Sequence, residues 1–456
     1  MLETATAQRI PVRFAGEGVG VEELTWGQRA AWGSMRINGE ADWAGGTMPL
    51  RDGQTVDELA ALLGVVMSRH QSLRTRFALD ADGEPRQFLT DEGEVFLEVV
   101  EAGDRDPETV AEAVRERLET APFDPAEDWS VRWAVICRDG VASWFVALYT
   151  HLVLDGYGIE ALTADLTDPP DEVPGVQPFE QARRQRAATA RRQQAASLRH
   201  WEQHLRAIPP ERFPPVAAPA EPRWWDVSYD SPATYLALHE VAARTKVHSG
   251  TVLLAAYAVA LARISGDPRT VLRTLVSNRF RPGFRETVAP VAQSALCVID
   301  VGGQTFDEVV ATAFQSQLSA GLHAYYDPRE LWAMIERVGT ERGAAIDVSS
   351  YFSDRRRSFA TFPDGMTVTA GDVTRALDRG RLRWGRRSDT PDTTCFLLVN
   401  PVPDTIDLTI RADTHRLSPD DMAGCLRAME EIVVSAAFPD TTRDRGEAAV
   451  VGEALR

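Results

Sequence analysis

Residues Trp144–Gly156 read W-F-V-A-L-Y-T-H-L-V-L-D-G, and in them an apolar run leads directly into a histidine and a predicted turn. The aromatic and aliphatic residues 144–149 predict a buried strand. A strand that ends at His151 would hold this imidazole on a rigid element. Histidine ionises near neutral pH, so His151 can accept a proton from an attacking amine or hydroxyl.

The residues after His151 are compatible with two roles. Asp155 can order the turn or pair with a cation, and Gly156 allows a substrate to approach the backbone closely. Taken alone, H-x-x-x-D-G also fits a histidine and an aspartate that only stabilise the end of a strand. The pattern therefore leaves a catalytic and a structural interpretation open.

Helix and strand signals alternate on both sides of this stretch. Asp139-Gly140 lies between two strand-like runs and predicts a hairpin, because glycine accepts the positive φ of a tight turn. Residues 234–266 predict two helices broken near Ser249-Gly250, and the strand T-V-L-R-T-L-V-S-N follows. Residues 55–73 predict a helix with one apolar face, formed by Leu59, Leu62, Leu63, Val66 and Met67. The predicted class is α/β (α+β layered).

Proline-rich segments divide the chain near its middle. The segments 168–178 and 208–222 flank an Arg/Gln/Ala-rich stretch that predicts a helix at about 179–206, and proline favours connectors over helices and strands. We expect an N-terminal subdomain at 1–178, a bridging helix and linker at 179–223, and a C-terminal subdomain at 224–456.

The composition excludes several classes of protein. The net charge of −18 disfavours nucleic acid and membrane surfaces as partners. The four cysteines form no C-x-x-C pair, so neither a zinc framework nor a disulfide scaffold is indicated, and Cys297 is expected to be a buried small apolar residue. No export signal and no apolar run of roughly 18 residues is visible, so we expect a soluble cytoplasmic protein.

Three polar clusters have a functional and a structural interpretation. The arginines between Arg183 and Arg192 predict a solvated helix face, with an acidic-partner surface as the alternative. The run 355–357 predicts a solvated loop, with carrier-protein docking as the alternative. His200 and His204 are four apart but do not form H-E-x-x-H, so no metal site is expected.

The central stretch resembles the H-H-x-x-x-D-G motif of condensation domains from nonribosomal peptide synthetases, which are members of the chloramphenicol-acetyltransferase-like superfamily. Four further segments are similar to family motifs and occur in the family's order: L-T-W-G-Q-R-A-A-W (24–32), R-H-Q-S-L-R-T-R-F (69–77), H-W-E-Q-H-L (200–205) and S-N-R (277–279). About the last sixty residues look like the family's strand-then-helix ending. The resemblance covers nearly the whole chain.

The resemblance implies two acetyltransferase-like subdomains that form a V-shaped pseudo-dimer with a tunnel between them. It implies that donor and acceptor thioesters enter on phosphopantetheine arms and that His151 deprotonates or positions the acceptor nucleophile. Asp155 is expected to be structural and to pair with Arg74, and the Gly156 N–H is expected to help place the acyl group.

Two positions depart from the family's pattern. Thr150 replaces the first motif histidine. The resemblance implies that this position is structural, so a retained active site is expected, and an altered or silent site is the alternative. Gln293, in V-A-P-V-A-Q-S, stands where the family has an asparagine, which affects the acceptor side of the tunnel. Further candidates for lining the tunnel are Ser349, Ser350 and Trp384, with core packing as the alternative for each.

The leading hypothesis is a free-standing condensation enzyme of natural-product biosynthesis that forms an amide or ester. An acyl or peptidyl carrier protein would act in trans, and the acceptor would be a small amine or alcohol or a second carrier protein. No cofactor is expected to bind this chain, because the carrier protein supplies the phosphopantetheine arm. The alternatives are a coenzyme A-dependent O/N-acyltransferase of the same superfamily that uses the same histidine, and a catalytically silent recruitment module.

Overall fold

The computed structural model describes residues 8–51, 53–167, 172–356, 361–363, 365–390 and 392–439. The chain divides into two compact units. The first contains Met1–Gln194, Ser277–Gln293 and Asp327–Arg329, and the second contains Ala195–Val276, Ser294–Tyr326 and Glu330–Arg456. The segment 277–293 therefore joins the first unit, although the proline-rich connectors suggest contiguous subdomains.

The first unit is built on two sheets. The larger has the strand order β1-β6-β7-β8-β3, and the smaller has the order β2-β5-β4. In the larger sheet β6 and β7 run parallel, and the other neighbours run antiparallel. The strands are β1 (Gln8–Ala15), β2 (Gly20–Glu23), β3 (Trp43–Pro49), β4 (Thr75–Leu79), β5 (Pro85–Leu89), β6 (Glu92–Glu101), β7 (Val131–Arg138) and β8 (Val141–Thr150).

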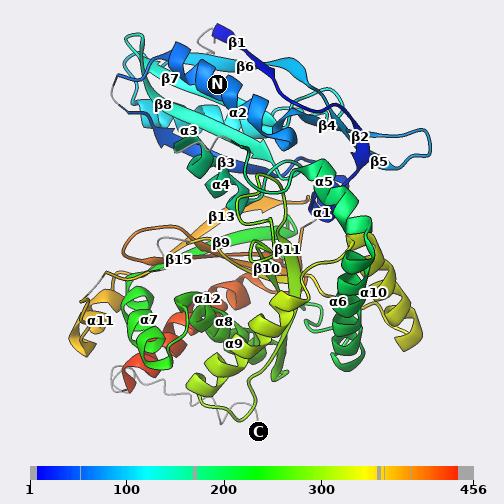
Figure 1. The fold of residues 1–456 in the computed structure, drawn as a ribbon. Coiled ribbons are helices and arrows are strands. Elements are labelled where there is room, and N and C mark those ends of the chain that lie inside the picture. Colours follow the sequence, from blue (N-terminus) through cyan, green and yellow to red (C-terminus); the bar gives the residue numbers. More distant parts are fainter. Residues whose placement is uncertain are drawn as a thin grey trace. The chain divides into compact units, whose positions relative to one another are not determined.

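Helices cover both faces of the larger sheet (Figure 1). Apolar side chains of α2 pack on one face with Val135 and Ala147, and those of α3 pack on the other with Ile136 and Leu148. This division follows from the alternation of side chains along β7 and β8. The helical elements are α1 (Trp26–Asn38), α2 (Val56–Arg69), the 3₁₀ turn η1 (Gln71–Arg74), α3 (Pro107–Thr120), α4 (Gly156–Thr167) and α5 (Pro178–Arg186).

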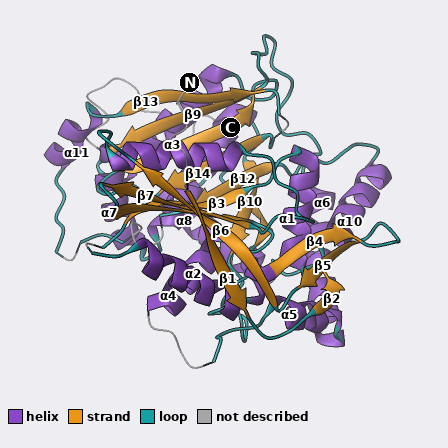
Figure 2. Cartoon of the chain, turned by 90° about the horizontal axis from the view of Figure 1, so that it is seen from above, coloured by secondary structure: helices purple, strands orange, loops and turns teal. Residues whose placement is uncertain are grey.

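The second unit contains a seven-stranded sheet of order β11-β10-β12-β14-β15-β9-β13, with β13 beside β9 at one edge (Figure 2). Its strands are β9 (Trp224–Ser231), β10 (Arg269–Val276), β11 (Gln293–Asp300), β12 (Ser350–Asp354), β13 (Arg381–Ser388), β14 (Cys395–Asn400) and β15 (Ile406–Asp413). Its helices are α7 (Pro232–Thr245), α8 (Ser249–Ser265), α9 (Phe306–Leu322), α10 (Pro328–Arg342), α11 (Ala370–Leu377) and α12 (Pro419–Ala437).

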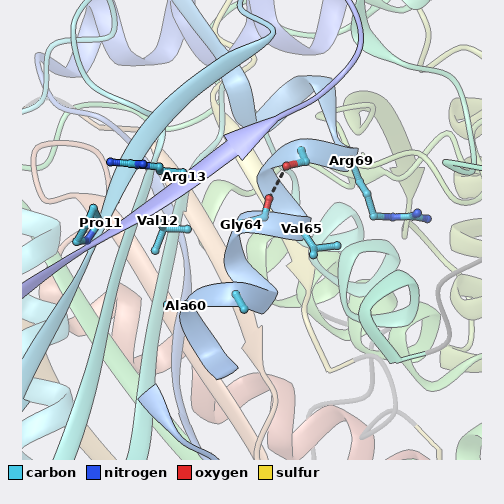
Figure 3. A pocket seen from close by; sticks show the side chains of 9 residues that line it. Pro11, Val12, Arg13, Ala60, Gly64, Val65 and Arg69 are labelled. Carbon is cyan, nitrogen blue, oxygen red and sulfur yellow. Dashed lines mark hydrogen bonds between the residues drawn. The ribbon is translucent and has the colours of Figure 1, made fainter. Parts of the chain in front are cut away.

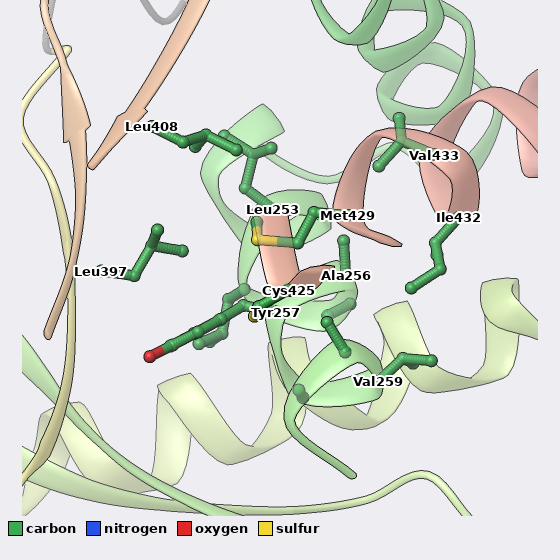
Figure 4. Close-up of a cluster of buried hydrophobic side chains, with 14 of the residues drawn as sticks. Leu253, Ala256, Tyr257, Val259, Leu397, Leu408, Cys425, Met429, Ile432 and Val433 are labelled. Carbon is green, nitrogen blue, oxygen red and sulfur yellow. The ribbon is translucent and has the colours of Figure 1, made fainter. Parts of the chain in front are cut away.

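The core of the second unit forms where α8 and α12 meet the sheet (Figure 4). Residues 249–262 of α8 are all buried, so this helix is apolar on every side. Tyr257 lies in this core with its hydroxyl 3.0 Å from the Cys395 sulfur. Side chains of α8, α12 and the strands β14 and β15 belong to one buried cluster.

Most local predictions are confirmed. Asp139 and Gly140 have φ values of 54° and 76° and connect β7 to β8 as the expected hairpin. The two helices expected at 234–266 are α7 and α8, and they break before Ser249. The bridging helix is present as two pieces, α5 and α6 (Ala188–Ala207). The mixed α/β class is confirmed as well.

The expectations for the polar clusters have mixed outcomes. The arginines of 183–192 are exposed, and Arg183 and Arg186 pair with Glu22. The solvated-loop prediction for 355–357 is wrong for Arg356, which is 1% exposed and pairs with Asp354 because a buried cation requires a partner. Arg357 lies outside the described residues.

Cys297 is buried as predicted, and burial raises the pKa of its thiol to about 11. No single helix in the described part of the chain is long and apolar enough to cross a membrane, and the bent pair formed by α7 and α8 passes only by combined length and composition.

Candidate functional site

The candidate site is built where β8 ends in the first unit. Residues 145–150 of β8 are buried, and the strand lies between β7 and β3. At the strand end the Thr150 N–H donates to Ser130 O, and the His151 N–H donates to Asp42 O at 2.9 Å. Asp42 directly precedes β3, so backbone hydrogen bonds from both neighbouring strands hold the start of the motif in place.

The imidazole of His151 is oriented by the turn that follows it. Nδ1 lies 2.9 Å from the Leu154 carbonyl oxygen, which can only accept a hydrogen bond. The neutral ring therefore carries its proton on Nδ1 and presents an unprotonated Nε2. The side chain is 34% exposed, and Nε2 lies 3.7 Å from the Asp42 carboxylate. Nε2 is thus the ring nitrogen left to accept a proton, on a side chain that is partly exposed.

The Asp155 carboxylate is fully engaged in holding the loop. Oδ1 accepts from the Gly158 N–H at 2.6 Å, which caps the first turn of α4. Oδ2 accepts from the N–H groups of Val291 and Ala292, both at 2.8 Å. The side chain is 9% exposed. Asp155 therefore fastens the motif loop to the segment 288–292, and its oxygens are not free to shuttle protons.

Arg279 is the charged partner of Asp155. Its Nη1 and Nη2 lie 3.0 Å from the two carboxylate oxygens, a bidentate arrangement. Nη2 also donates to the carbonyls of Thr287 and Ala289. Asn278, at φ 58°, turns the chain before this arginine, a backbone conformation that asparagine tolerates better than most residues.

The expected pairing of Asp155 with Arg74 is wrong. Arg74 is 1% exposed, and its guanidinium donates to the backbone carbonyls of Glu17, Gly18 and Thr90. It therefore fixes the glycine-containing loop between β1 and β2. The S-N-R segment contained the correct partner, but the sequence carried no signal that Asp155 contacts Arg279 and not Arg74.

Other residues of the R-H-Q-S-L-R-T motif also have structural contacts. Arg69 binds Asp165 of α4 through two hydrogen bonds, and His70 Nε2 lies 3.0 Å from the same carboxylate. Ser72 donates to Val288 O at 2.7 Å. The motif thus connects α2 to α4 and to the segment that surrounds Asp155.

Thr150 is buried at 1% exposure, and its hydroxyl has no hydrogen-bond partner. The alternation along β8 places it on the α3 side of the sheet, together with Val146 and Leu148. A buried hydroxyl without a partner contributes nothing to loop geometry. Thr150 therefore supports the site through its backbone hydrogen bonds, from its N–H to Ser130 O and from the Val153 N–H to its carbonyl, and not through its side chain.

Gly156 is the first residue of α4 and is half-buried. The N–H groups of a first helical turn have no partner within the helix, so this position suits binding of a partly negative oxygen. Its role in placing the acyl group stays a prediction.

The remaining candidates lie on or beside strands of the seven-stranded sheet. Gln293 is buried at the start of β11. Ser349 Oγ accepts from the Thr394 N–H, and Ser350 Oγ accepts from Arg212. Trp384 is 41% exposed, lies opposite the core residue Val227 and contacts the Trp225 ring edge-on. Lining of a tunnel by these residues stays a prediction.

A pocket of about 450 Å³ lies elsewhere in the first unit, between β1 and α2 (Figure 3). It is lined by residues 11–13 of β1 and by residues between 60 and 69 of α2. Gly64 lies close to the Arg13 backbone, because a Cβ at this position would be 2.8 Å from the Arg13 carbonyl oxygen. None of the motif residues 150–156 lines this pocket. The pocket is therefore not part of the site around His151.

Three histidines lie together in the second unit. The His200 ring stacks on His323 with centroids 4.2 Å apart and meets His204 edge-on at 4.6 Å. Burial and the two neighbouring rings lower the pKa of His200 to about 4. Within the described ranges, no group of three or more His, Cys, Asp or Glu side chains is arranged to hold a metal ion.

Comparison with known proteins gives a consistent family. The family model described as Condensation domain matches residues 47–354. Isonitrile lipopeptide synthase from Mycobacterium tuberculosis is 27% identical over 298 residues, which make up 59% of this chain. The chain spans only 12% of that synthase.

Two solved structures share the fold. The condensation domain that mediates chain release from the enacyloxin polyketide synthase superposes with a TM-score of 0.70 at 19% identity, over 95% of this chain and 85% of that one. The X-domain from teicoplanin biosynthesis superposes with a TM-score of 0.68 at 19% identity, over 93% and 97% of the two chains. Since the family model covers more than half of the residues and the motifs occur in its order, this chain belongs to the condensation domain family.

Proposed function

We propose that this chain joins a carrier-bound acyl or aminoacyl thioester to an amine or alcohol, forming an amide or ester in nonribosomal peptide or hybrid natural-product biosynthesis. The observation that carries the proposal is the orientation of His151, whose Nδ1 is committed to Leu154 O while Nε2 is unprotonated, on a side chain that is partly exposed. A general base requires a lone pair that the substrate can reach.

The proposed step is a nucleophilic acyl substitution. Nε2 of His151 accepts the proton of the acceptor N–H or O–H as its nitrogen or oxygen attacks the thioester carbon. The new C–N or C–O bond forms, the C–S bond breaks, and the leaving thiolate takes the proton back from the imidazolium. The phosphopantetheine arm of the carrier protein supplies the thiol, and the step uses no further cofactor.

The carboxylate of Asp42 supports this role electrostatically. Its Oδ2 lies 3.7 Å from Nε2, which is too long for a strong hydrogen bond but close enough to attract an imidazolium. Asp42 is 65% exposed, so water screens the attraction. We expect a modest effect of this group on the rate.

The test is detection of acyl transfer by intact-mass spectrometry. The purified chain is incubated with acyl-loaded carrier proteins or with the matching coenzyme A thioesters, together with small amines and alcohols. Loss of the acyl group from the carrier with formation of an amide or ester supports the proposal. Transfer only from coenzyme A thioesters would favour the related acyltransferase.

A second candidate function is that of a silent recruitment module. It is favoured by Thr150, which replaces a motif histidine and has a hydroxyl without a partner. The teicoplanin X-domain, which shares the fold, has been solved in a complex with OxyB. Carrier binding without transfer from any donor would favour this function over catalysis.

A further inference from the structure

Among the described residues of the second unit, one buried arginine forms no ion pair with a carboxylate. Arg273 on β10 is 7% exposed. Its Nε and Nη2 donate to the Ser294 hydroxyl at 3.0 and 2.5 Å, and its Nη1 donates to the Tyr351 hydroxyl at 2.5 Å. Hydroxyl groups satisfy hydrogen bonds but carry no formal charge. The positive charge of Arg273 is therefore not neutralised by these partners.

Other buried arginines in the described part of the chain are satisfied differently. Arg29, Arg212 and Arg356 each lie within ion-pair distance of a carboxylate, and Arg74 donates to three backbone carbonyls. No carboxylate of the described residues lies within 4.0 Å of Arg273, which distinguishes it from the three paired arginines. Burying a cation without a counter-ion is costly, so its retention requires a compensating interaction.

Aromatic rings provide part of that compensation. The guanidinium carbon lies 5.5 Å from the centroid of Trp201, 5.4 Å from that of Trp332 and 4.7 Å from that of Tyr351. A guanidinium over an aromatic face is attracted by the negative charge density of the ring. The rings attract the cation, but they carry no formal negative charge.

The groups beside the guanidinium also lack a charged acceptor among the described residues. Trp201 is fully buried, and its indole N–H has no acceptor. The Tyr326 hydroxyl donates to Ser294 O at 2.6 Å and lies 3.2 Å from the Ser294 hydroxyl. The hydroxyl oxygens of Ser294, Tyr326 and Tyr351, which accept hydrogen bonds around the cation, are thus all neutral. The missing component is an acceptor with a negative charge.

We propose that Arg273 binds the carboxylate of a small-molecule substrate whose apolar part contacts Trp332. A carboxylate matches the planar guanidinium fork and carries the single negative charge that would neutralise Arg273, whereas a phosphate dianion carries a second charge. Trp332 is 48% exposed, so the cluster lies one side chain from solvent. The inference rests on the proposed function only in treating the bound molecule as a substrate.

Equilibrium binding tests this site without requiring turnover. Isothermal titration of the full chain would use 3-phenylpropionate, its neutral analogue 3-phenylpropanamide, and inorganic phosphate. We expect the carboxylate to bind at least about ten-fold more tightly than the amide, and more tightly than phosphate. Arg273→Met should abolish this preference, and Arg269→Met, on the same strand but exposed, should retain it.

Two further variants separate binding from folding and from catalysis. Tyr351→Phe keeps the ring and frees the Nη1 donor, so the preference for carboxylate should persist or increase. His151→Ala should bind the carboxylate like the wild type even if turnover is lost. Equal binding of acid and amide by the wild type, an unchanged preference in a folded Arg273→Met protein, or tighter binding of phosphate would overturn the proposal.

Discussion

Asp155 and Arg279 are 124 residues apart in the sequence and form a bidentate ion pair, in which Nη1 and Nη2 of the arginine each lie 3.0 Å from a carboxylate oxygen. The side chains are 9% and 11% exposed. The same carboxylate accepts three backbone N–H groups, from Gly158, Val291 and Ala292. This network holds the loop that follows His151 and thereby determines where the imidazole lies.

Removing either partner of this pair should destabilise the first unit. We expect Asp155→Ala and Arg279→Ala each to lower the free energy of unfolding by about 3–5 kcal/mol, because the remaining charge stays buried without its partner. A double-mutant cycle by urea denaturation should give a coupling energy of about 1–3 kcal/mol. The cycle of Asp155 with Arg74 should give no significant coupling. Coupling to Arg74 but not Arg279 would contradict the structure.

Two glycines of α1 provide a matched test of close packing. A Cβ at Gly27 would lie 1.9 Å from Pro290 O, whereas a Cβ at Gly33 would meet no atom within 4 Å. Gly27→Ala should cost about 1–3 kcal/mol in the free energy of unfolding. Gly33→Ala should stabilise by up to about 1 kcal/mol, because alanine favours the helix. Thermal denaturation of both variants measures the difference, and equal effects would show that α1 does not pack on 277–293.

The buried hydroxyl of Thr150 should be dispensable. Thr150→Val keeps the branched shape and removes a hydroxyl without a partner, so stability should stay unchanged or rise by up to about 1 kcal/mol. Thr75 is the control, since its buried hydroxyl donates to Gln71 O at 2.6 Å. Thr75→Val should cost about 0.5–1.5 kcal/mol. A large loss of unfolding free energy in Thr150→Val would show that the Thr150 hydroxyl does form a hydrogen bond.

The cluster of His200, His204 and His323 should make the free energy of unfolding depend on pH. Burial, together with His323 and His204, lowers the pKa of His200 from 6.5 to about 4. Between these values the unfolded chain binds the proton more readily, so stability is fully present above pH 6.5 and falls as the pH drops toward 4. We expect a loss on the order of 1–3 kcal/mol, reduced by solvent because the ring is only half-buried. Urea midpoints of His200→Phe should depend less on pH in this window, and an unchanged dependence would contradict the assignment.

The sequence predicted those helices, strands and turns whose own residues carry a clear hydrophobic pattern or turn motif. The apolar run of β8, the Asp139-Gly140 turn and the apolar face of α2 all follow from residues within the element. By contrast, β3 has the sequence W-A-G-G-T-M-P and shows no clear alternation. It forms because it pairs with β8, and Gly45 is needed there since a Cβ would lie 2.0 Å from Ala147 O.

Tertiary contacts limited what could be predicted of the site. His151 and Asp155 were identified from their motif, and both lie where the motif implies a turn. Asp42 was missed, because only the pairing of Trp43 with Thr150 brings it beside His151. Arg279 was part of a quoted motif, but two arginines were available to Asp155. Only the fold distinguishes a cation that faces the loop from one that donates to backbone carbonyls.

The role of His151 is tested by the single-turnover rate of acyl transfer in His151→Ala compared with His415→Ala. The two histidines have similar side-chain exposure, 34% and 32%, and each lies near a carboxylate. We predict that His151→Ala lowers the rate by at least about 100-fold with little change in stability, and that His415→Ala transfers like the wild type. Equal rates in the wild type and in His151→Ala would contradict the central claim that Nε2 of His151 accepts the proton.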